Sequence, residues 1–229
     1  MKEKIADKLK QIQENMAKAA MKSGRDVSDI TLVAVTKTIE QQYIKYAYDL
    51  GLRDFGENRV QELSLKVEQL PTDINWHMIG HLQTNKVRNI VESVAMIHSI
   101  DSVRLAEEID KRAKLKNIIV DTLVEINIAE EDSKYGVTTK NLQILIEHIE
   151  QLPNISIKGL MCVAPFVEKP EQNRIYFEKM RKLFLDIKGK QEHNVDMRFL
   201  SMGMSGDYEI AIEEGANIVR IGTSLFGAR

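Results

Sequence analysis

Lys37 has the clearest potential for covalent chemistry in this chain. It follows the apolar stretch TLVAV, residues 31–35, which has the composition of a buried strand. Alternate side chains of a strand share a face, so Val33, Val35 and Lys37 are expected to point the same way. An apolar, partly dry setting disfavours the ammonium form, and a free amine can attack a carbonyl to give a Schiff base. A lysine that reaches solvent from a strand end is the plainer alternative.

Two loops of small residues near the C-terminus could bind an anion. The segment LSMGMSGDYE contains Ser205 and Gly206, which suit a tight turn, and Ser205 is a candidate cap for the short helix that follows. The segment IGTSLFG contains Gly222 and Thr223 in a second such loop. Backbone N–H groups at turns of this kind, and at helix starts, bind phosphate. Ordinary turns are the alternative, and the carboxylate of Asp207 could take the place of an anion.

Arg220 lies in VRIG, two residues before Gly222, and so shares that residue's face of a strand. A buried arginine needs a partner, which could be a carboxylate of the protein or a ligand atom that accepts a hydrogen bond. An amine for an aldehyde, a cradle for a phosphate and an arginine for a ring nitrogen are together the needs of one cofactor, pyridoxal 5′-phosphate.

Strand-like and helix-like segments alternate along the chain and would position these residues. Strands are expected at residues 31–35, 53–57, 74–80, 95–100, 122–128, 155–164, 196–203 and 217–222. Helices are expected at residues 5–20, 44–50, 60–70, 87–94, 101–113, 142–149, 170–187 and 208–214. This alternation predicts a parallel sheet, and eight strands predict a closed (β/α)8 TIM barrel with an extra N-terminal helix. An open doubly wound sheet is the alternative, but the first strand is not followed by its GxGxxG fingerprint.

Length and composition narrow the class of protein further. The 229 residues show no linker or repeat, which predicts a single domain over residues 1–229. A net charge of -2 without a basic stripe argues against nucleic-acid binding, and the apolar runs are too short to predict a membrane span. Cys162 is the one cysteine, so an intrachain disulfide is excluded, as suits a cytoplasmic protein.

Two other polar segments are weaker candidates for a site. His77 and His81 in HMIGH straddle a strand end and a glycine, which is poor geometry for a metal, and no third ligand is evident. His77 is expected to face the barrel mouth and His81 to pack in the loop. The charged segment EEDSKYG would follow the fifth strand, where it could cover the site, and its Lys134 could attract a phosphate.

A set of motifs resembles the pyridoxal phosphate homeostasis protein family, which includes bacterial YggS and the human proline synthase co-transcribed homologue. These motifs are VAVTK, FGENRVQE, WHMIGHLQTNK, EDSKYG, GLMC, LSMGMSGD and VRIGTSLFG, and they span nearly the whole chain in order. VAVTK alone is generic, but the set is specific. The resemblance implies a barrel similar to the N-terminal domain of alanine racemase.

The resemblance also implies roles for individual residues. Lys37 would carry the imine to pyridoxal phosphate, and Arg220 would lie beside the pyridine nitrogen. Four residues would surround the phosphate: Met204, Ser205, Gly222 and Thr223. Two would lie near the face or edge of the cofactor: Asn58 and His77. An always-charged arginine at the ring nitrogen discourages its protonation, which weakens the ring as an electron sink.

Three functions from different classes follow from these residues. The family resemblance implies a cytoplasmic carrier, expected to be monomeric, that holds pyridoxal phosphate and releases it to apo-enzymes that require it. An amino-acid racemase is the alternative, but alanine racemases use a tyrosine from a second, β-rich domain, which is expected to be absent because the chain ends at Arg229. A cofactor-free aldolase, with Lys37 taking the substrate carbonyl directly, is the third.

Overall fold

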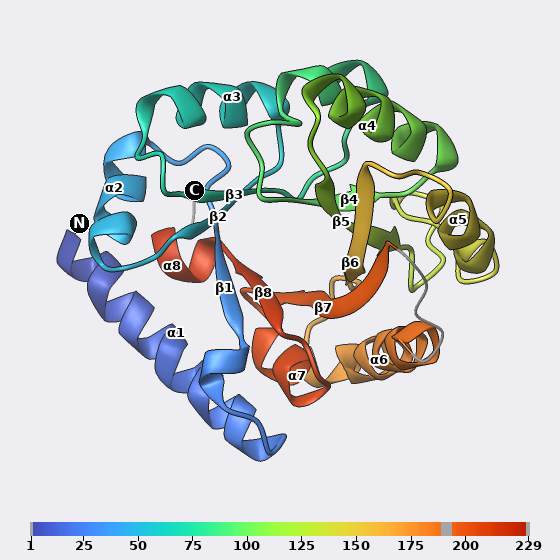
Figure 1. Ribbon diagram of the computed structural model, residues 1–229. Coiled ribbons are helices and arrows are strands. Elements are labelled where there is room, and N and C mark those ends of the chain that lie inside the picture. The colour runs from blue at the N-terminus through green and yellow to red at the C-terminus, as the bar shows by residue number, and fades with distance from the viewer. Residues whose placement is uncertain (1, 189–193, 228–229) are drawn as a thin grey trace.

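A closed barrel of parallel strands forms the centre of the molecule (Figure 1). The computed structural model describes residues 2–188 and 194–227. The strands pair in sequence order, and β1 pairs with β8 to close the barrel. They are β1 Thr31–Val35, β2 Asp54–Glu57, β3 Asn75–Met78, β4 Met96–Ile100, β5 Val120–Ile126, β6 Ile155–Cys162, β7 Val195–Met204 and β8 Ile218–Ile221. The predicted (β/α)8 barrel is confirmed.

Helices surround the barrel on its outside (Figure 1). The α-helices are α1 Lys2–Lys22, α2 Gln41–Asp49, α3 Val60–Gln69, α4 Val103–Lys116, α5 Leu142–Ile149, α6 Arg174–Lys188, α7 Tyr208–Glu213 and α8 Thr223–Phe226. Short 3₁₀ helices are η1 Val27–Asp29, η2 Thr84–Asn89 and η3 Pro170–Asn173. None of these helices, in the part of the chain that the structure describes, combines the length and hydropathy of a membrane span.

The extra N-terminal helix is confirmed, and it covers a flank of the barrel. One face of α1 is buried, with Ile5, Leu9, Ile12 and Met16 at helical spacing. This face packs against α2, α7 and α8, as Figure 1 shows. The helix therefore supports the two elements that follow β7 and β8.

One predicted helix, at residues 87–94, is wrong. Val87, Ile90 and Val91 are buried as their spacing suggests, but the chain forms the 3₁₀ helix η2, followed by turns. Thr84, Asn85 and Asn89 explain the difference in part, because these side chains compete for backbone hydrogen bonds and are poor helix formers.

The interior of the barrel combines an apolar layer with polar groups. The apolar cluster consists of Val33, Met96, Leu123, Met161 and Ile218. His98, Glu125 and Arg220 are buried two residues beyond cluster members on β4, β5 and β8, and so share their faces. His77 on β3 and Ser201 on β7 are further buried polar residues of the barrel strands. Because buried polar groups need hydrogen-bond partners, these residues must form hydrogen bonds mainly with one another or with a ligand.

Candidate functional site

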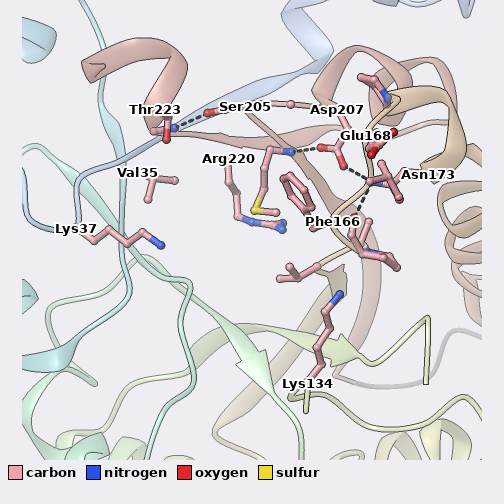
Figure 2. Close-up of a pocket in the computed structure, with 18 residues that line it drawn as sticks. Val35, Lys37, Lys134, Phe166, Glu168, Asn173, Ser205, Asp207, Arg220 and Thr223 are labelled. Atoms are coloured by element: carbon pink, nitrogen blue, oxygen red, sulfur yellow. Dashed lines mark hydrogen bonds between the residues drawn. The ribbon is translucent and has the colours of Figure 1, made fainter. Parts of the chain in front are cut away.

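A cavity of about 680 Å³ lies at the carboxyl ends of the strands, within the size range of small-ligand sites (Figure 2). It is lined by the segments that follow β1, β5, β6, β7 and β8. The predicted residues that line it are Lys37, Met204, Ser205, Arg220, Gly222 and Thr223. The barrel thus brings together residues from both ends of the sequence, at the end of the fold where TIM-barrel sites occur.

Lys37 is held in a turn that is anchored on both sides. The carbonyl oxygen of Thr36 accepts a hydrogen bond from Lys66 Nζ at 2.7 Å. The backbone N–H of Thr38 donates to Glu62 at 2.8 Å, and Thr38 has a φ of +60°, which is unusual for a β-branched residue. Lys37 itself is half-buried, and its amine points into the cavity (Figure 2).

A buried ion pair lies beneath this turn. Lys66 Nζ lies 2.5 Å from Glu57 Oε1, and the hydroxyl of Thr36 donates to the same oxygen at 2.7 Å. Burial raises the pKa of the Glu57 carboxyl, while its hydrogen bonds from Lys66 and Thr36 act in the opposite direction. The pair ties the turn that carries Lys37 to the end of β2 and to α3.

The two C-terminal loops meet through Ser205. Ser205 Oγ accepts hydrogen bonds from the backbone N–H groups of Gly222, at 3.3 Å, and Ser224, at 3.2 Å. Ser205 is therefore not the cap of α7, and the residue at that position is Asp207. Within residues 2–188 and 194–227, the N–H groups of Gly206 and Thr223 form no hydrogen bond. These two donors remain available to an anion in the cavity.

Asp207 does not compete for that position, because both of its carboxylate oxygens are used in the fold. One oxygen accepts from the backbone N–H of Met204 at 2.7 Å. The other accepts from the side-chain amide of Asn173 at 2.8 Å (Figure 2). The carboxylate thereby closes the turn between β7 and α7.

Arg220 is 4% exposed and lies at the floor of the cavity. Its Nη1 donates to Ser201 Oγ at 2.6 Å and its Nη2 donates to the carbonyl of Cys162 at 2.8 Å. Burial lowers the pKa of the guanidinium, and in the described part of the chain no carboxylate forms an ion pair with it. A guanidinium has five N–H donors, so three remain after these two bonds. A ligand that accepts hydrogen bonds fits this surplus.

Asn58 and His77 differ from the other predicted residues, because they do not line the cavity. Asn58 lies in the bend after β2, against Gly80, and its amide oxygen is buried without a hydrogen-bond partner. His77 lies inside the barrel, where its two nitrogens contact His98 at 2.9 Å and Asp54 at 3.1 Å. His77 therefore faces the barrel interior and not the mouth.

The segment after β5 does reach the site. Lys134 lines the cavity, with its Nζ 2.7 Å from Glu131 Oε1. Figure 2 shows it on the side opposite Ser205 and Thr223, away from the two free N–H groups. His81 packs in the loop as predicted, stacked on Tyr135 at 3.9 Å between ring centroids.

Sequence reasoning missed the segment after β6. Residues 163–168 line one wall of the cavity, and the side chain of Phe166 is 99% exposed. The signal was present, because apolar residues continue past the predicted strand end, and segments at this end of a barrel build its site. Asn173, which also lines the cavity, had no comparable signal.

Comparisons with known proteins agree with this architecture. The family model described as the alanine racemase N-terminal domain matches residues 8–229. A pyridoxal phosphate homeostasis protein of Aquifex aeolicus is 46% identical over 97% of both chains. The structure of PipY from Synechococcus elongatus with PLP bound is 32% identical, with a TM-score of 0.83 over 97% of this chain and 100% of that one.

An alanine racemase from Clostridium difficile shares the fold alone. It is 16% identical, with a TM-score of 0.70 over 97% of this chain and 57% of that one. The family model covers nearly the whole chain, and the Aquifex aeolicus relative matches along 97% of its length. The chain therefore belongs to the pyridoxal phosphate homeostasis protein family, whose barrel is that of the alanine racemase N-terminal domain.

Proposed function

We propose that this protein binds pyridoxal 5′-phosphate and holds it covalently on Lys37. The amine of Lys37 would condense with the aldehyde to form an imine, with loss of water. The free N–H groups of Gly206 and Thr223 would receive the phosphate, and Arg220 would donate to the ring nitrogen. The single observation that carries the proposal is that one cavity contains all three kinds of group at once.

The relatives support this choice of ligand. PipY carries PLP in its solved structure, and the curated relative is named for pyridoxal phosphate homeostasis. Asn58, whose buried amide oxygen has no hydrogen-bond partner in the described part of the chain, follows β2 at the same end of the barrel and would lie near the edge of the cofactor. Met204, Ser205 and Gly222 also line the cavity beside these two N–H groups and would surround the phosphate.

The cavity suits storage and release better than catalysis. Arg220 disfavours a protonated ring, so the ring would assist carbanion formation only weakly. Among the described residues that line the cavity there is no tyrosine to act as a second base, as a racemase would need. An imine is reversible, and an open cavity lets water reach it, which would allow release to apo-enzymes that require the cofactor.

The same proposal includes a monomeric state and a cytoplasmic location. All of the groups proposed to hold the cofactor come from one chain of one domain, so a second copy is not needed to complete the site. With one cysteine, which is buried, the chain forms no intrachain disulfide, and this favours a reducing compartment such as the cytoplasm.

The proposal is tested by loading the purified protein with pyridoxal phosphate, reducing it with borohydride and mapping the adduct by mass spectrometry. We expect the loaded wild type to be yellow and to give one phosphopyridoxyl adduct, on Lys37. The Lys37→Ala variant should lose both the adduct and the yellow colour. Exposed Lys140→Ala is the matched control and should retain both. An adduct on Lys134 in place of Lys37 would overturn the site. Robust Lys37-dependent deuterium uptake at the α-carbon of alanine would favour the racemase instead.

A further inference from the structure

A continuous chain of hydrogen bonds crosses the barrel interior, from Arg220 to Asp54. Ser201 Oγ accepts from Arg220 Nη1 at 2.6 Å and lies 3.1 Å from His98 Nδ1. His98 Nε2 lies 2.9 Å from His77 Nδ1, and His77 Nε2 lies 3.1 Å from Asp54 Oδ1. The five residues come from β8, β7, β4, β3 and β2, so the chain exists only in the closed barrel.

The two ends of this chain have different surroundings. His98 and Ser201 are fully buried, and His77 is 5% exposed. Asp54, by contrast, begins β2 at the amino end of the barrel, and 28% of its side chain is exposed. The chain therefore links solvent at one end of the barrel to the cofactor cavity at the other.

The direction of donation along the chain follows from its Asp54 end. A carboxylate only accepts, so His77 carries a proton on Nε2, and in a neutral ring its Nδ1 must accept. His98 therefore donates from Nε2, and its own Nδ1 accepts from the Ser201 hydroxyl. Burial, together with the neighbouring His77 and Arg220, lowers the pKa of His98 well below its usual value, in agreement with a neutral His98 ring.

At the Arg220 end of the hydrogen-bond series, this direction determines the role of Ser201. Its one hydroxyl proton is committed to His98, so it can only accept from Arg220. No carboxylate among residues 2–188 and 194–227 pairs directly with Arg220. Within these residues, the hydrogen bonds through Ser201, His98 and His77 are therefore the one connection from Arg220 to a carboxylate, that of Asp54. A rigid acceptor at Nη1, together with the Cys162 carbonyl at Nη2, sets the plane of the guanidinium.

We propose that Asp54, His77, His98 and Ser201 form a one-way hydrogen-bond relay that positions Arg220. The relay aims the remaining N–H groups of Arg220 at the cavity, where they would meet the ring nitrogen of the cofactor. Ser201 and the two histidines are positioning residues, since they act through Arg220 without touching the ligand. The ligand's identity rests on the proposed function, whereas the relay itself does not.

The first test needs neither a variant nor the cofactor. Long-range ¹H–¹⁵N spectra of the cofactor-free protein near pH 7.5 report which ring nitrogen of each histidine carries a proton. We expect His98 to be neutral, and the proton on the Nε2 side in both His77 and His98. A charged His98, or a proton on its Nδ1, would overturn the relay.

The second test separates positioning from packing. A glutamine at position 98 retains an acceptor and a donor at about the spacing of the ring nitrogens, whereas a leucine retains neither. We expect His98→Gln to bind pyridoxal phosphate within about threefold of the wild type, and His98→Leu and Ser201→Ala to bind about tenfold more weakly, the effect of one lost hydrogen bond to a charged group. Equal losses in His98→Gln and His98→Leu would overturn the relay.

The two proposals fail in distinguishable ways. If the protein binds no pyridoxal phosphate, the proposed function fails, and the tautomers in the cofactor-free protein still decide the relay. If it binds through Lys37 while Ser201→Ala binds as tightly as the wild type, the relay fails and the proposed function stands. If His98→Leu does not fold, Ser201→Ala and the spectra carry the test.

Discussion

At the scale of single residues, the barrel keeps two ionisable groups, Arg220 and Glu125, away from water. Arg220 is buried with a hydroxyl and a carbonyl as its partners, and Glu125 is buried with one unpartnered oxygen. Burial and the nearby carboxylate of Asp101 raise the pKa of Glu125 to about 7, while Arg220 acts in the opposite direction. Glu125 is therefore a group whose ionisation opposes folding near neutral pH.

Glu125 gives a prediction about stability and pH. Its folded pKa is above its unfolded value, so its contribution is complete below about pH 4.5 and is lost as the pH rises through about 7. The loss amounts to roughly 3 kcal/mol at most. Glu125→Gln should therefore gain up to this amount relative to wild type between pH 5 and pH 8, measured by urea unfolding. The exposed Glu147→Gln is the control, and an equal pH dependence in wild type and Glu125→Gln would contradict the prediction.

At the scale of secondary-structure elements, the turn between β1 and α2 determines where Lys37 lies. Its position depends on α3, which supplies Lys66 and Glu62, and on β2, which supplies Glu57. Removing one partner of a buried ion pair leaves the other charge uncompensated. The position of the turn therefore depends on this pair.

We expect Lys66→Met to destabilise the fold by roughly 3–5 kcal/mol, because Glu57 would be left buried without a cation. The double variant Lys66→Met, Glu57→Gln should recover much of the loss. Lys116→Met is the matched control, because its pair with Glu92 is about half exposed and should contribute less than about 1 kcal/mol. Chemical unfolding of the four proteins measures this; a loss in Lys66→Met as small as the control's would show that the pair is dispensable.

At the scale of the whole molecule, α1 links the start of the chain to the elements that carry the phosphate loops. Its buried face packs on α7 and α8, and Lys22 forms an ion pair with Glu213 at 2.8 Å. Because β8 also pairs with β1, the loops that would bind the phosphate are held by both ends of the sequence. We expect the helix and barrel to unfold as one unit.

Leu9→Ala tests this coupling. Leu9 is 4% exposed, so its truncation should cost about 2–5 kcal/mol, whereas Lys10→Ala on the exposed face should cost less than about 0.5 kcal/mol. Trp76, the one tryptophan, is buried on β3. Its fluorescence and the far-UV circular dichroism should shift to the same lower midpoint. Separate midpoints for the two signals would mean that α1 unfolds independently of the barrel.

The sequence by itself determined the strands, the barrel and the place of Lys37 at a strand end. Each strand follows from a pattern within a few consecutive residues, and the barrel follows from eight strands that alternate with helices. Local patterns were less reliable where apolar spacing and turn-forming side chains disagreed, as at residues 87–94. They also suggested Ser205 as a helix cap, but its hydroxyl oxygen accepts hydrogen bonds from two backbone N–H groups of the segment after β8.

Only the tertiary structure decided which polar groups meet. The chain from Asp54 to Arg220 joins residues on five strands, and its link between His98 and Ser201 spans 103 positions of sequence. The ion pair between Glu57 and Lys66 likewise joins a strand to the helix that follows it. Hydrogen bonds depend on distances of a few tenths of an ångström, and those distances are set by barrel closure, which brings together side chains that no local pattern relates.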